Sequence, residues 1–286
     1  MTTCLVFGAS GMVGQFLLPR LSAAGLRVLA VSRRAQPALP DGQWLQADLG
    51  QPLPVPPGSE ATISCGPLDA FARWYADAAT GAGPVVALGS MSAVSKRTSP
   101  DPLERELAAR LVASEQQLLA SAAQRGARAV ILRPTLIYGS GRDRSLARIA
   151  RFARRWRMYP RLHGASGLRQ PVHADDLAQA CLALLTPPAA GVYAVGGGER
   201  LDCAQMIERT CCSLEVACLP IPLPVAVLGS RAIAGIARAM GWGALHAASI
   251  ARLREDLVAD NGPAARDFGW APRPFEPAAA TWPRLP

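Results

Sequence analysis

Three glycines directly after a short apolar run restrict the possible folds of this chain more than any other feature of its sequence. Residues 4–7 read CLVF, and Gly8, Gly11 and Gly14 follow within the segment GASGMVG. A short apolar run bounded by glycine is typical of a buried parallel strand. Gly8 permits a sharp turn, Gly11 permits a close approach of the main chain to a phosphate, and Gly14 permits close packing of a helix on the sheet. Because a helix N-terminus offers N–H groups and the positive end of a dipole, this segment predicts a binding site for a dinucleotide pyrophosphate.

The segments that follow alternate in the way expected of an α/β protein. Helical spacing covers residues 11–24 and 99–123, and apolar runs predict strands at 27–32, 44–47, 61–65, 84–89, 129–132 and 191–195. Alternating strands and helices predict a doubly wound parallel sheet with helices on both faces. We expect a dinucleotide-binding domain over residues 1–140, completed by residues 170–197. A smaller C-terminal substrate lobe is expected over most of residues 141–286.

The end of the second predicted strand bears on the type of cofactor. NAD-binding sites usually have an acidic residue here, which accepts a hydrogen bond from the ribose 2′-OH. This chain has Ser32, Arg33 and Arg34 instead, and a guanidinium group can bind a 2′-phosphate through paired donors. The sequence therefore favours NADP(H), while NAD(H) stays open. The alternative is that one or both arginines are solvated surface residues.

Composition and charge restrict the remaining classes of function. The 7 cysteines include no C-x-x-C pair and lack the spacing of metal ligands, so we expect free thiols and no metal site. No signal peptide is visible, and Arg231 and Arg238 interrupt the most apolar stretch at residues 225–240, so we expect a cytoplasmic protein that does not span a membrane. The formal net charge of +9 favours an anionic partner, although a biased genome composition would also enrich arginine.

Beyond the glycine turn, several short segments follow one another in an order that is typical of one known family. They are ADL at residues 47–49, ILRPTLIYG at 131–139, RQPVHADD at 169–176, VYAVGGG at 192–198 and FGWAP at 268–272. Together with GASGMVG, they resemble the motifs of an extended or atypical short-chain dehydrogenase/reductase of the NAD-dependent epimerase/dehydratase family. The resemblance covers nearly the whole chain and implies a Rossmann fold with a small C-terminal substrate lobe.

The resemblance also implies which residues surround the cofactor. The glycine turn would contact the pyrophosphate, the end of the second strand the adenosine phosphate, the segment after the third strand adenine, and the segment after the sixth strand nicotinamide. The corresponding residues are, in that order, Gly8, Ser10, Gly11, Met12, Val13 and Gly14; Ser32, Arg33 and Arg34; Asp48 and Leu49; and Pro134, Thr135 and Leu136. Cys65 and Gly66 would line the cofactor beyond the fourth strand.

Three later residues correspond to the family's substrate-binding part. Arg169 matches a position that contacts substrate phosphates in members acting on nucleotide sugars. His173 and Asp176 are expected to hold the lobe in place rather than to react.

One part of the family's pattern is missing. Active members use a Tyr-x-x-x-Lys pair to transfer a proton while a hydride moves, and an acid follows the lysine by four residues. With Glu115 as that acid, the tyrosine and lysine positions fall on Leu107 and Leu111. No tyrosine lies between Tyr75 and Tyr138, so a shift of register does not restore the pair.

Two serines keep a catalytic role open. Ser90 and Ser92 follow the predicted strand 84–89 and could hydrogen-bond a substrate oxygen, so they are the candidate catalytic residues. Lys96 could supply charge, although a solvated loop lysine is the simpler interpretation. Arg110 could replace the electrostatic role of the missing lysine, but it cannot act as a base near neutral pH.

A basic helix is predicted over residues 144–156. Arg144, Arg148, Arg151 and Arg155 recur at helical spacing and therefore share one face. The simplest interpretation is a solvated face, followed by a clamp for an anionic substrate. Contact with a nucleic acid and contact with a membrane surface are two further alternatives. Nucleic-acid binding is disfavoured because no known binding motif accompanies the charge.

These observations give one leading hypothesis and one main alternative. The first is an NADP(H)-binding oxidoreductase or epimerase that acts on a small phosphorylated substrate without the usual tyrosine and lysine. The alternative is a catalytically inactive NADP(H)-binding sensor or assembly protein. By analogy with the family, we also expect a homodimer formed through the helix at residues 99–123.

Overall fold

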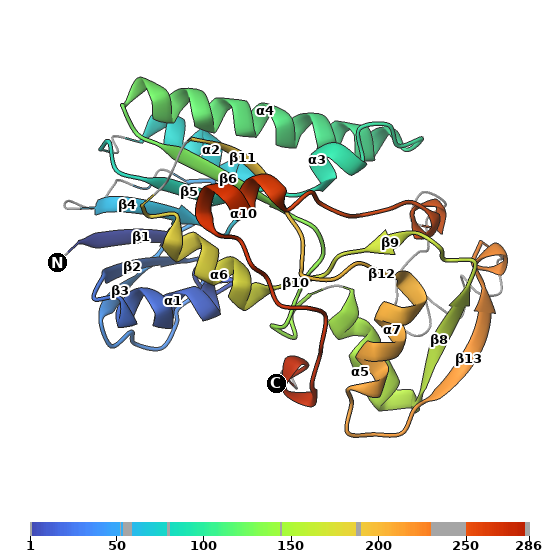
Figure 1. Cartoon of the computed structure of the whole chain (residues 1–286). Helices are drawn as coiled ribbons and strands as arrows, with labels where there is room; N and C mark the ends of the chain where they lie inside the picture. Colours follow the sequence, from blue (N-terminus) through green and yellow to red (C-terminus); the bar gives the residue numbers. More distant parts are fainter. Residues whose placement is uncertain are drawn as a thin grey trace.

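The strands predicted from the sequence assemble into one seven-stranded, fully parallel sheet in the order β11-β6-β5-β4-β1-β2-β3 (Figure 1). The computed structural model describes residues 2–51, 53, 59–78, 81–143, 145–186, 190–229 and 250–283. The strands are β1 (Thr3–Phe7), β2 (Arg27–Ser32), β3 (Gly42–Gln46), β4 (Ser59–Ser64), β5 (Val85–Leu88), β6 (Ala129–Pro134) and β11 (Gly191–Val195). The predicted doubly wound α/β fold is thus confirmed.

The strand order reverses at β1, which pairs with β2 on one side and with β4 on the other. The register brings Phe7 at the end of β1 opposite Val31 and Ser64, and Ser32 opposite Gln46. The carboxyl ends of these strands therefore meet at one edge of the sheet. In open α/β sheets, ligands bind outside this edge at the point of reversal.

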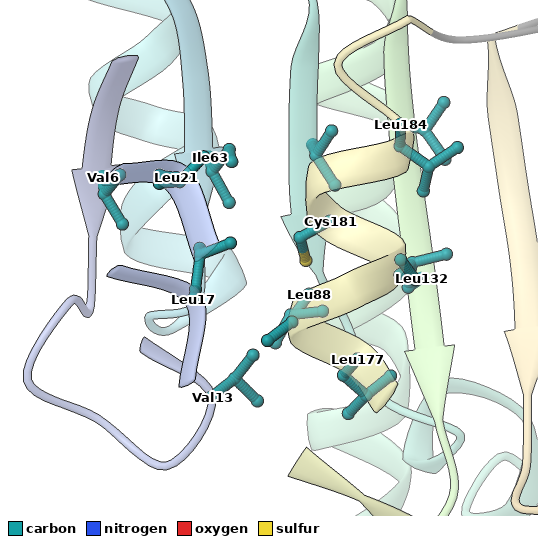
Figure 2. Packing of buried hydrophobic residues seen from close by; sticks show 14 of the residues in the cluster. Val6, Val13, Leu17, Leu21, Ile63, Leu88, Leu132, Leu177, Cys181 and Leu184 are labelled. Atoms are coloured by element: carbon teal, nitrogen blue, oxygen red, sulfur yellow. The ribbon is translucent and has the colours of Figure 1, made fainter. Parts of the chain in front are cut away.

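Helices cover both faces of the sheet. α1 (Gly14–Ala23) and α6 (Ala174–Ala183) lie on one face, and α2 (Leu68–Asp77) and α4 (Pro102–Gln124) lie on the other (Figure 1). Figure 2 shows the first of these layers, in which apolar side chains of the two helices point toward the strands; they include Val13, Leu17, Leu21, Leu177, Cys181 and Leu184 from the helical side and Val6, Ile63, Leu88 and Leu132 from the sheet.

Three helices differ from the sequence prediction, and the first of them, α1, begins at Gly14 rather than at residue 11. α2 was not predicted, although Leu68, Phe71 and Tyr75 recur at helical spacing and are buried against the sheet. α4 begins at Pro102 rather than at residue 99, because the side chain of Asp101 accepts the N–H of Leu103 over 3.0 Å and so caps the helix.

The smaller lobe lies beyond the carboxyl edge of the sheet (Figure 1). Its larger elements are α5 (Leu146–Trp156), β8 (Met158–His163), α7 (Cys203–Cys212) and β13 (Leu219–Pro224), and β8 pairs in parallel with β13. Two smaller ladders join β7 (Ile137–Tyr138) to β10 (Val172–His173) and β9 (Leu168–Arg169) to β12 (Leu201–Asp202). The lobe has its own apolar core, which contains Leu146, Met206, Phe275 and Trp282.

The remaining elements are short. They are α3 (Ser92–Ser95), η1 (Val225–Val227), η2 (Arg252–Arg254), α10 (Gly262–Phe268) and η3 (Ala279–Thr281). Within the described ranges, no helix combines the length and the apolar character that a membrane span requires. Arg231 and Arg238, on which the prediction for residues 225–240 rested, lie outside the described residues.

Candidate functional site

The glycine turn connects β1 to α1 and has a shape that only glycine allows. Gly8 has φ of +66°, and a Cβ on it would lie 2.6 Å from the carbonyl carbon of Cys65. A Cβ on Gly14 would lie 2.2 Å from the main-chain oxygen of Ala9, and one on Gly11 would lie 2.9 Å from that of Gly8. Since the bare main chain leaves an open cradle before the N-terminus of α1, the turn fits a pyrophosphate group.

A pocket of about 200 Å³ opens beside this turn. Its wall combines the turn with the ends of β2 and β3 and the start of α2, and the predicted cofactor residues in it are Gly8, Ser10, Gly11, Ser32, Arg33, Asp48 and Leu49. The hydroxyl oxygens of Ser10 and Ser32 lie 3.2 Å apart and join the turn to β2. We call this space the adenosine pocket. The structure thus brings together seven residues that the sequence placed around the pyrophosphate and the adenosine.

The other predicted residues of this part lie around the pocket without lining it. Val13 is buried in the core below the turn, so only its main chain can face a ligand. Arg34 is exposed, and its N–H donates to Ser32 Oγ over 3.3 Å. A Cβ on Gly66 would lie 3.6 Å from Leu49 Cδ1, so Gly66 lies beside one of the residues expected to contact adenine. Met12 is half-buried in the turn.

Cys65 follows β4 and belongs to a group of thiols below the turn. A hydrogen bond with Cys65 and complete burial raise the pKa of the Cys181 thiol well above its ordinary value. Burial raises the pKa of the Cys4 thiol to about 12. Cys4 and Cys181 are therefore protonated near neutral pH and pack as small apolar side chains, with Cys65 against the same core.

A second pocket, of about 190 Å³, lies at the ends of β5 and β6 under the smaller lobe. We call it the serine pocket, because Ser90, Ser92 and Ser95 line it together with Thr135. The N–H of Met91 donates to Pro134 O over 3.1 Å and so fixes the serine segment beside β6. These contacts bring the predicted catalytic serines and one predicted nicotinamide residue, Thr135, to the same cavity.

The hydroxyl groups of Ser90 and Thr135 are arranged differently. Ser90 Oγ accepts the N–H of Ser92 over 3.1 Å, which leaves the Ser90 hydroxyl proton to donate to a substrate oxygen. Thr135 instead donates its hydroxyl to the main-chain oxygen of Gln170. Pro134 is buried, and Leu136 packs against the core of the lobe, so neither side chain lines the serine pocket.

Charged side chains form one wall of the serine pocket. Lys96 Nζ lies 3.2 Å from Glu104 Oε1, and Arg252 donates to the same carboxylate oxygen. Burial raises the pKa of Glu104, but hydrogen bonds from Ser99 and Lys96 and the charge of Arg252 together hold it below its ordinary value. Two cations of the pocket wall therefore share one carboxylate, whose position on α4 could not be inferred from the sequence.

Arg169 lies in the same wall, but its guanidinium group also has a structural role. The side chain is 7% exposed, and it donates to the main-chain oxygens of Leu168 over 2.8 Å, Glu255 over 2.7 Å and Arg252 over 2.6 Å. These bonds attach the segment that carries Arg252 to β9. A direct contact of Arg169 with substrate phosphates stays a prediction.

The positions of the missing catalytic pair lie on α4. Leu107 and Leu111 are half-buried, and Leu111 packs against the core between α4 and the sheet. Glu115, from which these positions were counted, is 2% exposed and binds Arg133, whose Nε donates over 2.8 Å. Among the described residues that line the serine pocket, none is a tyrosine.

His173 and Asp176 hold parts of the molecule together. His173 Nδ1 accepts the N–H of Asp175 over 3.1 Å at the start of α6, and its ring lies 5.0 Å from that of Tyr138. Burial lowers the pKa of His173, and the charge of Arg273 lowers it further. Asp176 accepts from Arg273 Nε over 2.7 Å, which attaches the C-terminal segment to α6.

The basic face of α5 is separate from both pockets. Arg144 lies outside the described residues, and none of the other predicted arginines of this face lines the adenosine or the serine pocket. Arg151 and Arg155 are exposed, and the Arg155 guanidinium lies 5.2 Å from the ring centre of Trp156. The geometry gives no support to a substrate clamp formed by this face.

The chain can be compared with known proteins at this point. Residues 77–196 match the model of the NAD dependent epimerase/dehydratase family. The resemblance to this family is confirmed. A curated relative, the uncharacterized protein y4nG of Sinorhizobium fredii, is 27% identical over 186 residues, which are 63% of this chain. The aligned part covers 45% of that relative, so this chain matches less than half of its length.

Several solved structures share the fold at low sequence identity. MoeE5 in complex with UDP-glucose and NAD is 18% identical, covers 98% of this chain and 97% of its own, and has a TM-score of 0.71. A UDP-glucose 4-epimerase from Thermotoga maritima with UDP-glucose is 14% identical over 98% of this chain and 96% of its own, with a TM-score of 0.68. The NAD-dependent NDP-hexosamine 5,6-dehydratase TunA is 17% identical over 98% and 95%, with a TM-score of 0.66.

Proposed function

We propose that this member of the fold binds NADP(H) and acts as an oxidoreductase or epimerase on a small phosphorylated substrate. The observation that carries the proposal is the adenosine pocket, in which the glycine turn and the ends of β2 and β3 meet. When bound, the cofactor would supply or accept a hydride. The solved neighbour MoeE5 holds NAD, which supports binding of a nicotinamide dinucleotide.

Arg33 supports NADP(H) over NAD(H). Its exposed side chain lines the adenosine pocket at the end of β2, where NAD-binding sites usually carry an acid. Ser32 Oγ already contacts Ser10 Oγ and accepts the N–H of Arg34, so it serves mainly to shape the wall. The charge available for a 2′-phosphate therefore comes from the arginines.

The choice of an anionic substrate rests on three cations of the serine pocket, Lys96, Arg169 and Arg252. They line the pocket beside two exposed carboxylates, Glu255 and Asp256, and Glu104 pairs with Lys96 and Arg252. In this proposal, the Ser90 hydroxyl orients the substrate oxygen. The Lys96 ammonium stabilises negative charge that develops on the same oxygen, which is the electrostatic role that the family's tyrosine and lysine share. The proton itself would come from Lys96 or from water.

The alternative is a catalytically inactive NADP(H)-binding sensor or assembly protein. Leu107 and Leu111 favour it, since they stand where the family's proton donor and its lysine are expected. Both functions require the adenosine pocket, but only the enzyme requires Ser90 and Ser92.

Two measurements test the proposal and separate it from the alternative. The first is calorimetric titration of the purified protein with NADPH, NADP⁺, NADH and NAD⁺, in which we expect the 2′-phosphorylated forms to bind more tightly. Failure of all four nucleotides to bind would contradict the proposal.

The second measurement is NADPH oxidation in the presence of phosphorylated aldehydes, phosphorylated ketones and nucleotide sugars. The double variant Ser90→Ala, Ser92→Ala should lower turnover about tenfold or more with unchanged NADPH affinity, because a hydrogen bond to the reacting oxygen is lost. Under the alternative, wild type and variant would both be inactive.

The expected partners and location belong to the same proposal. The expected homodimer, formed through α4, is tested by the molar mass from size-exclusion chromatography with light-scattering detection. A cytoplasmic location is tested by fractionation of cells. Nucleic-acid binding through the Arg151 and Arg155 face would require an affinity that falls steeply with salt. We do not include it in the proposal, because no nucleic-acid-binding motif accompanies this face.

A further inference from the structure

Arg142 joins the smaller lobe to the glycine turn. It lies in the loop between β7 and α5, and its Nη1 donates to the main-chain oxygen of Ser10 over 2.5 Å. Ser10 lines the adenosine pocket, although it is 132 residues away in the sequence. A permanent cation therefore lies against the segment whose open main chain fits a pyrophosphate.

The loop that carries Arg142 is held in a defined conformation. Gly141 has φ of +68°, a value that favours glycine, and the N–H of Arg142 donates to Ser140 Oγ over 3.3 Å. The next residue, Asp143, is 4% exposed and accepts the N–H of Ala147 over 3.0 Å, which ties the loop to the start of α5. The main chain at Arg142 is thus fixed on both sides, so the side chain leaves the loop from a defined point.

The chemistry of the side chain matches a phosphate group. A guanidinium group carries five N–H donors, and the Ser10 bond is made through Nη1, so Nε and Nη2 remain for further acceptors. Paired donors on a plane suit the oxygens of a phosphate. The N-terminus of α1, which directly follows the same turn, supplies further main-chain donors.

We propose that Arg142 is a ligand of the cofactor pyrophosphate, supplied to the glycine turn by the smaller lobe. The inference rests on the proposed function, because it takes the adenosine pocket to be the cofactor site. It adds a contact that does not come from the dinucleotide-binding part of the chain. Binding of the cofactor then ties the lobe to the sheet through a second set of bonds besides the one to Ser10.

Two nucleotides with different phosphates test the assignment. Adenosine diphosphate ribose carries the pyrophosphate but no 2′-phosphate, and adenosine 2′-phosphate carries the 2′-phosphate but no pyrophosphate. Calorimetric titration of Arg142→Gln should show about tenfold or more weaker binding of adenosine diphosphate ribose, because charged hydrogen bonds to phosphate are lost. Its affinity for adenosine 2′-phosphate should stay within about twofold of wild type, whereas Arg33→Gln should show the opposite pattern.

A matched variant controls for the change in net charge. Arg155 is exposed near the C-terminal end of α5, where its guanidinium lies 5.2 Å from the ring centre of Trp156 instead of against the glycine turn, so Arg155→Gln should leave both affinities unchanged. Arg142→Lys should recover part of the loss, since it keeps the charge without the paired donors. The thermal unfolding temperature of each variant reports whether the fold is intact.

Each remaining outcome has a distinct meaning. If Arg142→Gln binds adenosine diphosphate ribose as wild type does, the Arg142 assignment is wrong while the proposed function stands. Equal losses for both nucleotides would also overturn it, because they would indicate a long-range charge effect or a distorted pocket. If the wild-type protein binds neither nucleotide nor NADPH, the proposed function fails and the assignment fails with it.

Discussion

The adenosine pocket and the serine pocket lie along the same edge of one sheet, but they are built in different ways. The adenosine pocket is formed by the ends of β1, β2 and β3, the short segments that follow them and the start of α2, and its central part is a main-chain shape. The serine pocket is formed by side chains from α3, the segment after β6, β9 and residues 252–257. A site made from strand ends is fixed as soon as the sheet forms, whereas a site made from distant side chains depends on how the lobe is held.

The difference extends to the energetics of the two sites. The three glycines would each meet main-chain atoms if they carried a Cβ, so their role is steric. The serine pocket depends on charge: Glu104 holds Lys96 and Arg252, and Arg169 holds the segment that carries Arg252. We therefore expect substitutions near the two pockets to fail for different reasons, and the following predictions test this.

The largest effect is expected at Glu115, beside the serine pocket. Its carboxylate is 2% exposed and binds Arg133 on β6, and a Cβ on Gly89 before Ser90 would lie 3.3 Å from it. Glu115→Ala would leave Arg133 without its partner, and we expect the free energy of unfolding to fall by about 3 kcal/mol. Urea unfolding monitored by circular dichroism measures this change.

Glu106 provides the control for this prediction. It is an exposed glutamate on the same helix, so Glu106→Ala should change the free energy of unfolding by about 0.5 kcal/mol or less. Equal effects of the two substitutions would contradict the view that the Glu115 carboxylate holds Arg133 and stabilises the fold.

The next effect is expected at Gly11, in the adenosine pocket. A Cβ there would lie 2.9 Å from Gly8 O, and the larger side chain of Gly11→Val would also fill the cradle. The clash lowers folding stability by about 1–3 kcal/mol, and a side chain in the cradle also obstructs the pyrophosphate, so NADPH affinity should fall by about tenfold or more, as measured by calorimetry. Gly81→Val is the control, because a Cβ on Gly81 meets no atom within 4 Å. Unchanged affinity in Gly11→Val would mean that the cofactor does not lie in the turn.

The comparison also shows which parts could be predicted from the sequence. The sheet and the adenosine pocket were predictable because their signals are local: an apolar run, glycines at fixed spacing, and the residues at the ends of strands. Leu107 and Leu111 were located by counting back from Glu115 on one helix. The missed α2 had a local signal in Leu68, Phe71 and Tyr75, and would have been found by applying the same periodicity test to that segment.

The remaining features have no local signal. Arg142 contacts Ser10 across 132 residues, and Arg252 contacts Glu104 across 148. Nothing in the sequence near either arginine distinguishes it from the other arginines of a chain with net charge +9. The position of Arg169 was predicted from the motif, but its three bonds to main-chain oxygens depend on how residues 252–255 fold back onto β9.

The smallest effect is expected at His173, which lies where the sheet with its helices joins the smaller lobe. Its ring packs between Phe16 of α1 and Tyr138 of β7. Burial lowers the pKa of His173 in the folded protein, and the nearby charge of Arg273 lowers it further, although Asp175 and Asp176 oppose this. In the unfolded chain the pKa is about 6.5, so below this pH the unfolded state binds the proton more readily.

The sign of the pH dependence follows from this difference. Above about pH 6.5, His173 does not lower the free energy of unfolding. As the pH falls from there toward the lower folded pKa, this free energy decreases, with a slope that corresponds to at most about one proton taken up on unfolding. His173→Asn keeps an acceptor for the N–H of Asp175 at the start of α6, so it should flatten the slope of unfolding free energy between pH 7.5 and pH 5.5. The exposed His163 on β8 is the control, and His163→Asn should leave the slope as it is in wild type. If His173→Asn and wild type lose stability equally over this range, protonation of His173 does not oppose folding. The junction between the sheet and the smaller lobe would then be insensitive to the charge of His173.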